Sequence, residues 1–245
     1  MFIIQRVRAI LTLLIAPFLT LIVSMLALAD MLWIRKSELK VLVFPRYWGK
    51  ILCRLPGVRV RVEGLDHIDP QATYIFAANH CSQYDIFAFQ GYFPYDFRWI
   101  AKQELFHLPI FGRAMRQVGY IPVDRSQGRQ ALKSLDQAAQ RIAMGHSVII
   151  FPEGTRSHDG KLQEFKTGAI LLAIKAGVPI VPVGFNGSYE ILSKGKLLPK
   201  SGEICIRIGT PLPTEQYRPS DKQALAQAVH AAVENELDER YRQHP

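Results

Sequence analysis

Cysteine is scarce in this chain, and no two cysteines are close together. The 245 residues contain only Cys53, Cys81 and Cys205. Their odd number and wide spacing, without any C-x-x-C pair, argue against a disulfide framework and against a cysteine-based zinc site. This pattern favours a reducing compartment, and we expect the protein to use neither a metal nor another cofactor.

Several well-known catalytic signatures are also missing. The sequence has no Walker loop, no G-x-G-x-x-G and no H-E-x-x-H, which argues against P-loop nucleotide hydrolysis, dinucleotide binding and zinc proteolysis. The G-x-S-x-G turn that a serine hydrolase would need is absent as well. There are no internal repeats and no low-complexity tracts.

Acidic residues are outnumbered by basic ones. The 30 Lys and Arg against 21 Asp and Glu give a formal charge of +9. Such a surplus suits partners that carry phosphate, of which nucleic acid and an anionic membrane are the two obvious kinds. A chain of this length, with 49% hydrophobic residues, can bury one substantial core.

Charge is absent from residues 9–29, which read AILTLLIAPFLTLIVSMLALA. As a helix at 1.5 Å per residue this stretch would span ~30 Å, the thickness of a bilayer core. A cleavable signal peptide usually has a shorter apolar core of ~7–15 residues, although Ala27-Leu28-Ala29 resembles a cleavage site. The stretch therefore favours a membrane over nucleic acid as the partner, and cleavage is the lesser alternative.

A second segment, residues 37–55, mixes apolar and basic residues and contains Trp48, which suits a helix lying in the headgroup layer. Pro17 predicts a kink or break in the first helix. We expect residues 1–56 to form a kinked or paired-helix anchor that enters and leaves on the cytoplasmic face. A single membrane span is the alternative, since basic residues flank the apolar stretch almost evenly.

The pattern of residues 57–245 predicts an α/β domain. Short apolar, β-rich runs alternate with helical patterns, which predicts a mixed, mainly parallel sheet with helices on both faces. The predicted strands are 59–63, 74–78, 98–101, 120–123, 147–151, 180–185 and 204–208, and the predicted helices are 128–144, 167–176 and 221–240. In such sheets ligands bind at the carboxyl ends of the strands.

The first polar motif follows the strand predicted at 74–78. His80 and Asp85 would lie ~140° apart on an ideal helix and would not face each other. A turn at His80, with Asp85 in the first turn of the next helix, would bring the carboxylate to one imidazole nitrogen and leave the other free as a base. For an isolated His and Asp, a hydrogen-bonded loop histidine without catalytic function is the commoner outcome.

Two arginines follow predicted strands in the same way. Arg125 ends the motif GYIPVDR, and Arg156 lies in FPEGTRS directly after an apolar strand. Arginine can grip a phosphate through two parallel hydrogen bonds, so two arginines at neighbouring strand ends are suited to share one phosphate. A further motif, VPIVPVG at 178–184, reads as part of the wall of a site.

Together these four ordered motifs resemble the glycerolipid acyltransferase family, and within it the bacterial 1-acylglycerol-3-phosphate acyltransferases. The His-x4-Asp block, GYIPVDR, FPEGTRS and VPIVPVG occur in the family's order, and the resemblance extends over about residues 60–210. It implies a glycerol-3-phosphate acyltransferase-like α/β fold preceded by an N-terminal anchor.

The resemblance also implies a reaction, which is transfer of an acyl chain to the 2-hydroxyl of lysophosphatidic acid to give phosphatidic acid in phospholipid biosynthesis. The donor would be a thioester of acyl carrier protein or coenzyme A, and the place the cytoplasmic face of the bacterial inner membrane. The expected catalytic residues are His80, Asp85 and Lys102, and the expected substrate-binding residues are Asn79, Arg125, Glu153, Gly154, Thr155 and Arg156. We expect Glu153 to orient Arg156 or the glycerol backbone.

The sequence leaves other hypotheses open. The acceptor could be glycerol 3-phosphate or another lysophospholipid, and a non-catalytic lipid-binding membrane protein is the alternative from another class. Cys81, next to His80, could be taken for the thiol nucleophile of a hydrolase. Adjacent residues usually point apart, so we expect no such role for Cys81.

Overall fold

The computed structural model describes residues 2–34, 43–124 and 129–242 of the chain. Within these ranges seven strands form one sheet in the order β1-β7-β6-β2-β5-β3-β4. Neighbouring strands are parallel except β6 and β7, which are antiparallel. The strands are β1 (Val58–Glu63), β2 (Ile75–Ala78), β3 (Arg98–Lys102), β4 (Ile121–Val123), β5 (Val148–Ile150), β6 (Ile180–Asn186) and β7 (Gly202–Ile208).

All seven predicted strands are therefore confirmed, as is the mixed, mainly parallel sheet. The central strands β2, β5 and β6 are buried along their whole length. This explains why they are continuous apolar runs rather than alternating ones, because helices cover both faces of the sheet.

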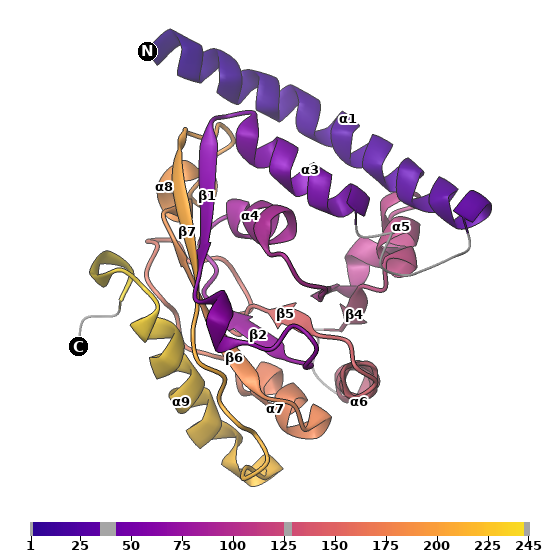
Figure 1. Cartoon of the computed structure of the whole chain (residues 1–245), viewed down its shortest axis with the longest axis vertical. Coiled ribbons are helices and arrows are strands. Elements are labelled where there is room, and N and C mark those ends of the chain that lie inside the picture. The colour runs from indigo at the N-terminus through magenta and orange to yellow at the C-terminus, as the bar shows by residue number, and fades with distance from the viewer. Residues whose placement is uncertain (1, 35–42, 125–128, 243–245) are drawn as a thin grey trace.

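Helices form a layer on each side of the sheet (Figure 1). One core lies between the sheet and α6, α7 and α9, and the other between the sheet and α3 and α4. The helices are α1 (Phe2–Ile34), α3 (Val43–Arg54), α4 (Tyr84–Tyr92), α5 (Phe111–Gln117), α6 (Arg129–Ala143), α7 (Thr167–Ala176), α8 (Ser188–Ile191) and α9 (Lys222–Asn235), with 3-10 turns η1 (Leu65–His67), η2 (Gln103–His107), η3 (Pro219–Asp221) and η4 (Glu239–Tyr241).

The last helix is shorter than predicted. The pattern predicts a helix over 221–240, but α9 ends at Asn235. Beyond it the chain turns inward and buries Leu237 and Tyr241. The Tyr241 hydroxyl accepts a hydrogen bond from the backbone N–H of Gly187. A continuing helix would not bring Tyr241 to this position, so tertiary packing overrides the helical pattern.

The N-terminal helix α1 is one continuous helix of 33 residues that contains Pro17. Of the kink or break predicted at Pro17, the break is therefore wrong. The indole nitrogen of Trp48 on α3 donates to the Thr20 hydroxyl at 3.0 Å, and the Thr20 hydroxyl donates to the Ala16 carbonyl at 2.7 Å. These bonds tie the turn after the proline to α3.

Helices α1 and α3 lie side by side and run in opposite directions (Figure 1). The guanidinium of Arg8, near the start of α1, donates to the carbonyls of Arg54 and Leu55 at the end of α3. Of the second anchoring segment predicted at 37–55, the part from Val43 to Arg54 is helical as expected. Residues 35–42 lie outside the described residues.

The ends of the strands define one functional edge of the sheet. The carboxyl ends of β2, β3, β5 and β6 meet there because these strands are parallel. Strand β7 is antiparallel to β6, so β7 and its parallel neighbour β1 begin at this same edge. The polar motifs that follow β2 and β5 are therefore neighbours in space.

Candidate active site

The centre of the edge is a hydrogen-bonded pair, His80 and Asp85. Imidazole Nδ1 lies 2.9 Å from the Asp85 Oδ2 atom, and Asp85 is in the first turn of α4, as the sequence predicts. A carboxylate partner fixes the proton on Nδ1 and leaves the lone pair on Nε2. Among the described residues no group is hydrogen-bonded to Nε2, and His80 lines a large cavity.

Asp85 is fully buried and its bonds are unevenly shared between the two oxygens. Oδ2 also accepts the backbone N–H groups of Cys81 and Ser82, each at 2.8 Å. Within the described parts of the chain, Oδ1 has no hydrogen-bond partner. Three donors converging on one oxygen fix the carboxylate and, through it, the orientation of the imidazole.

The FPEGTRS segment holds His80 from three sides. The Glu153 Oε1 atom accepts the His80 backbone N–H, and the Ser157 N–H donates to the His80 carbonyl at 2.7 Å. The Phe151 ring stacks on the imidazole with centroids 3.9 Å apart and planes at 10°. We call Phe151, Glu153 and Ser157 the clamp. It follows from the pairing of β2 with β5, which places the segments after these two strands together.

The Glu153 carboxylate helps to position the base His80. Its second oxygen, Oε2, accepts the Gln163 side-chain amide at 2.6 Å, and the residue is only 3% exposed. Among the described residues Glu153 bonds to His80 and Gln163 and not to Arg156, so the structure gives no support to the expectation that it orients Arg156. A role of Glu153 toward the glycerol backbone stays a prediction. Burial raises the pKa of this carboxyl to about 8, in spite of hydrogen bonds from His80 and Gln163 that lower it.

Arg156 and Thr155 lie beside His80 in the cavity wall, together with Gly154. Within the part of the chain that the structure describes, the Arg156 guanidinium has no carboxylate partner. Lys194 secures this segment, since its ammonium donates to the Thr155 hydroxyl at 3.2 Å and to the Arg156 carbonyl at 2.9 Å. Among the described residues the arginine thus has no counter-charge, and it lines the same cavity as the base His80.

Gly154 has a backbone conformation that needs glycine. Its φ is +77°, and a Cβ there would lie 2.9 Å from the Lys166 ammonium. The Lys166 side chain therefore lies close to the FPEGTRS turn and adds its positive charge to those of Arg156 and Lys194.

The cavity next to His80 has a volume of about 690 Å³ and is mostly apolar. It extends from His80 and Arg156 to Thr20 and Ala27 of α1. Its walls come from α1, α3, α4, β3, η2 and α5, through Val23, Ser24, Pro45, Trp48, Gln83, Ile86, Phe87, Ile100, Ala101, Lys102, Leu105, Phe111, Ala114, Met115 and Val118, among others. A polar mouth joined to a long apolar interior suits an amphipathic ligand with a charged head and a hydrocarbon chain.

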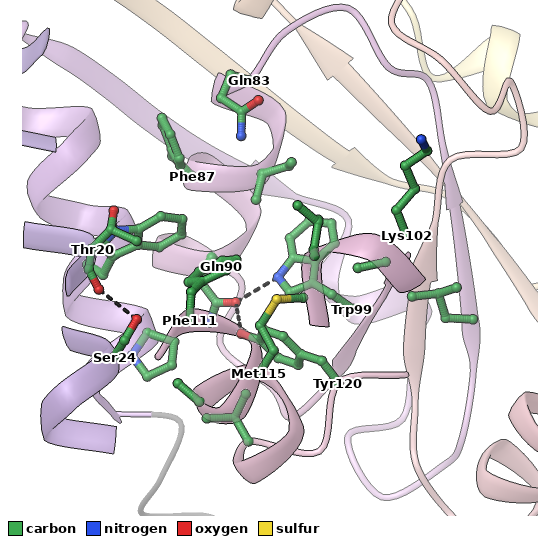
Figure 2. A pocket seen from close by; sticks show the side chains of 18 of the residues that line it. Thr20, Ser24, Gln83, Phe87, Gln90, Trp99, Lys102, Phe111, Met115 and Tyr120 are labelled. Carbon is green, nitrogen blue, oxygen red and sulfur yellow. Dashed lines mark hydrogen bonds between the residues drawn. The ribbon is translucent and has the colours of Figure 1, made fainter. Parts of the chain in front are cut away.

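Figure 2 shows a polar group inside this apolar space. The Gln90 Oε1 atom accepts two hydrogen bonds of 2.7 Å, from the indole N–H of Trp99 and from the Tyr120 hydroxyl. The N–H of Trp99 and the hydroxyl of Tyr120 are thus both satisfied by one acceptor in the cavity wall.

Comparison with known proteins identifies the family of this site. A sequence profile described as Acyltransferase matches residues 59–186, just over half of the 245 residues. The chain belongs to the acyltransferase family. This match includes the His-x4-Asp block, the FPEGTRS segment and the whole of the motif at 178–184.

Curated relatives carry more specific names. Proteins named 1-acyl-sn-glycerol-3-phosphate acyltransferase alpha, from Ovis aries and Homo sapiens, are each 36% identical over 180 residues, which is 73% of this chain. A 1-acyl-sn-glycerol-3-phosphate acyltransferase from Cocos nucifera is 31% identical over 192 residues. This chain covers 63%, 64% and 62% of these three relatives, so it spans less than two thirds of their length.

A solved structure extends the similarity to nearly the whole chain. It is the crystal structure of the 1-acyl-sn-glycerophosphate (LPA) acyltransferase PlsC from Thermotoga maritima, with a TM-score of 0.78 and 27% identity. The similarity covers 94% of this chain and 97% of that one. The α/β sheet and the preceding helices of this acyltransferase family member therefore have a solved counterpart.

The remaining predicted site residues have different surroundings. Lys102 ends β3 and lines the cavity, with Glu104 3.6 Å from its ammonium. Asn79 is 1% exposed, and its amide accepts from and donates to the backbone of Phe185 on β6, so it ties two strands together instead of facing the cavity. Arg125 lies outside the described residues; the strand before it pairs Val123 with Lys102.

Several residues of the site were not singled out from the sequence. Phe151, Ser157 and Gln163 support His80 and Glu153, and Lys194 secures the Arg156 segment. Phe151 and Ser157 lie within the FPEGTRS motif, so this motif is the sequence signal that could indicate their role. Gln163 and Lys194 lie outside the four motifs, and no pattern in the sequence indicates them.

Proposed function

We propose that this protein transfers an acyl chain from a thioester to the 2-hydroxyl of lysophosphatidic acid and so produces phosphatidic acid. The observation that carries the proposal is the position of His80. It lines a mostly apolar cavity together with Arg156, which has no carboxylate partner among the described residues, and its Nδ1 is bonded to Asp85, which leaves Nε2 as the base. The names of the relatives and of the structural neighbour support the same acceptor.

The reaction requires one positioned base. His80 Nε2 takes the proton of the acceptor hydroxyl while Asp85 stabilises the imidazolium that forms. The oxygen attacks the thioester carbonyl, and the tetrahedral intermediate collapses by breaking its carbon–sulfur bond. The thiolate leaves and takes the proton back from His80. A thioester is already activated, so no covalent enzyme intermediate is needed.

Three cations are suited to the charges of this reaction. Arg156, and Arg125 by its motif, would grip the acceptor phosphate, with Gly154 and Thr155 shaping the same turn. Lys102 is the candidate for the developing oxyanion, since it lines the cavity at the end of β3. The apolar interior would hold an acyl chain, and its volume of about 690 Å³ is in the range of ligand pockets.

The N-terminal region supports attachment to a membrane. From Ile3 to Ala29 helix α1 is long and apolar enough to cross a bilayer. In this structure α1 lies against α3 and α5, which favours a paired-helix anchor that lies in one leaflet. We propose that residues 1–56 anchor the domain of residues 57–245 to the cytoplasmic face of the bacterial inner membrane, with an acyl carrier protein or coenzyme A thioester as donor and no cofactor.

An acceptor panel tests the proposal. Purified full-length protein in detergent is given a long-chain acyl thioester, as coenzyme A and as acyl carrier protein conjugates in separate reactions. The acceptors are lysophosphatidic acid, glycerol 3-phosphate and lysophosphatidylcholine, and products are identified by mass spectrometry. We expect phosphatidic acid as the main product. A preference for either other acceptor would overturn the substrate, and no acylation of any acceptor would overturn the enzyme assignment.

A further inference from the structure

Two adjacent leucines are exposed in the segment between α8 and β7. Leu197 is 71% and Leu198 46% exposed. They lie in the sequence Lys194-Gly195-Lys196-Leu197-Leu198-Pro199-Lys200, which we call the Lys–Leu loop. Among the described residues neither Lys196 nor Lys200 has a carboxylate partner. Apolar side chains presented between uncompensated cations are a surface for a partner that is both apolar and anionic.

The loop is joined to the active site by hydrogen bonds. Ser193 forms a β-bridge with Ser82, and the Ser82 hydroxyl donates to the Leu192 carbonyl at 2.8 Å. Ser82 in turn donates its N–H to Asp85. At the start of the loop, Lys194 holds the Thr155–Arg156 segment. The loop is thus bonded to the turn that holds Asp85 and to the segment that carries Arg156.

The loop also leads to the strand end beneath α1. It is followed by Gly202, which pairs with Val58 at the start of β1. The preceding residue, Gly57, lies against the Arg8 guanidinium of α1, since a Cβ on Gly57 would be 3.0 Å from it. The Lys–Leu loop and the N-terminal half of α1 are therefore at the same edge of the molecule.

The neighbouring surface of α1 is strongly apolar. Its outward side chains in this half include Ile3, Ile4, Val7, Ile10, Leu11 and Leu14, all exposed. A helix of this composition that lies on the domain has its free side available for lipid. The exposed leucines of the loop and this apolar surface are thus at the same edge of the molecule.

We propose that the Lys–Leu loop is a second membrane contact, separate from the N-terminal anchor. Leu197 and Leu198 enter the interfacial layer of an anionic bilayer, and Lys196 and Lys200 bind its phosphate groups. Through Lys194 the loop holds Arg156 at the level of the headgroups, where the phosphate of a lipid acceptor lies. The position of the loop at the same edge as the apolar surface of α1 favours a lipid surface over an acidic protein as the partner.

Fluorescence in vesicles tests the contact without using enzyme activity. The native cysteines are buried, so Leu197→Cys in the full-length protein offers one accessible thiol for a polarity-sensitive dye. Met144→Cys is the matched control, because Met144 is equally exposed at 71% but precedes the amino end of β5, at the opposite edge of the sheet. Both are reconstituted into vesicles of phosphatidylcholine and phosphatidylglycerol that contain spin-labelled lipid.

We expect a blue shift and quenching of the dye at position 197 and neither at position 144. Equal quenching at the two positions, or none at position 197, would overturn the membrane contact. A blue shift at position 197 that needs an added acidic acyl carrier protein, and not lipid, would also overturn it and assign the loop to that partner.

A kinetic test measures the consequence and rests on the proposed function. In the double variant Leu197→Ser with Leu198→Ser, we expect the KM for lysophosphatidic acid in anionic vesicles to rise by roughly tenfold. The KM for a short-chain acceptor dissolved as monomers should stay unchanged, which shows that the site is intact. An equal rise for both acceptors would contradict the proposal, whereas absence of any acylation by the wild type would count against the proposed function alone.

Discussion

His80 is held at four points by side chains or backbone groups from two separate segments. Asp85 fixes the ring through Nδ1, Phe151 covers one face of it, and Glu153 and Ser157 bond the backbone N–H and carbonyl. A base that is fixed in this way needs little reorganisation before it accepts a proton. The clamp makes the position of the base depend on the same segment that carries Arg156.

Cys81 is the residue that most invites another mechanism, and its surroundings argue against one. It is 1% exposed, and burial together with the Asp85 charge raises the pKa of its thiol well above the usual value. We expect Cys81→Ala to keep most of the acyltransferase activity, measured as kcat/KM for lysophosphatidic acid. Near-total loss in a folded variant would contradict His80 as the base and point to a thiol nucleophile.

Glu153 should give the fold a pH dependence. In the unfolded chain the pKa of this carboxyl is near its ordinary value of 4.5, whereas burial in the fold raises the pKa to about 8. Between pH 4.5 and about pH 8 the folded state binds more protons at this carboxyl than the unfolded state does. The contribution of Glu153 to the free energy of unfolding is therefore greatest at low pH and falls as the pH rises to about 8.

The amide in Glu153→Gln does not titrate, so this variant should gain stability relative to wild type as the pH increases. Between pH 5 and pH 8.5 we expect the difference in unfolding free energy to move in favour of the variant by on the order of a few kcal/mol. Thermal unfolding in detergent at both pH values measures this. A constant difference would show that the buried carboxyl is already ionised at low pH.

At the scale of elements, the strands were predictable and their contacts were not. Each strand is an apolar run bounded by glycine, proline or a polar residue, so local sequence determines it. The stacking of Phe151 on His80 depends on the pairing of β2 with β5, whose partners are about 70 residues apart. The His80–Asp85 contact was predictable because it needs only one turn and the start of one helix.

The segment that carries Arg156 should act mainly on the acceptor. A charged hydrogen bond contributes about 1.5–3 kcal/mol, so Arg156→Ala should raise the acceptor KM by roughly 10–100-fold. The donor KM should change far less. Arg113→Ala, at an exposed arginine of α5, is the control and should change neither. Equal increases in both KM values for Arg156→Ala would refute the assignment of Arg156 to the acceptor phosphate.

At the scale of the whole molecule, α1 is both a candidate anchor and a wall of the cavity. Its outer face is exposed, while Thr20, Ser24 and Ala27 line the space that leads to His80. A sequence pattern reveals the apolar composition of such a helix but not which of its residues face the domain. The division into an anchor of residues 1–56 and a domain of residues 57–245 stays a prediction, and the cavity depends on both parts.

This double role predicts that a bulky residue on the inner side of α1 changes substrate preference. Ser24→Phe should partly fill the far end of the cavity and lower kcat/KM for long-chain acyl substrates more than for short-chain ones. Leu14→Phe, on the exposed side of α1, is the control and should leave the preference unchanged. The measurement is a chain-length series of thioesters and of acceptors. Identical effects of the two variants would show that α1 acts only as an anchor.

The most direct test of the account compares wild type with His80→Ala in thioester-dependent acylation of lysophosphatidic acid, with glycerol 3-phosphate as a parallel acceptor. Circular dichroism first establishes that the variant is folded. We expect wild type to form phosphatidic acid and His80→Ala to lose activity by roughly 10²–10⁴-fold, the usual contribution of a positioned base. A folded His80→Ala variant that forms phosphatidic acid at the wild-type rate would contradict the role of His80 as the catalytic base.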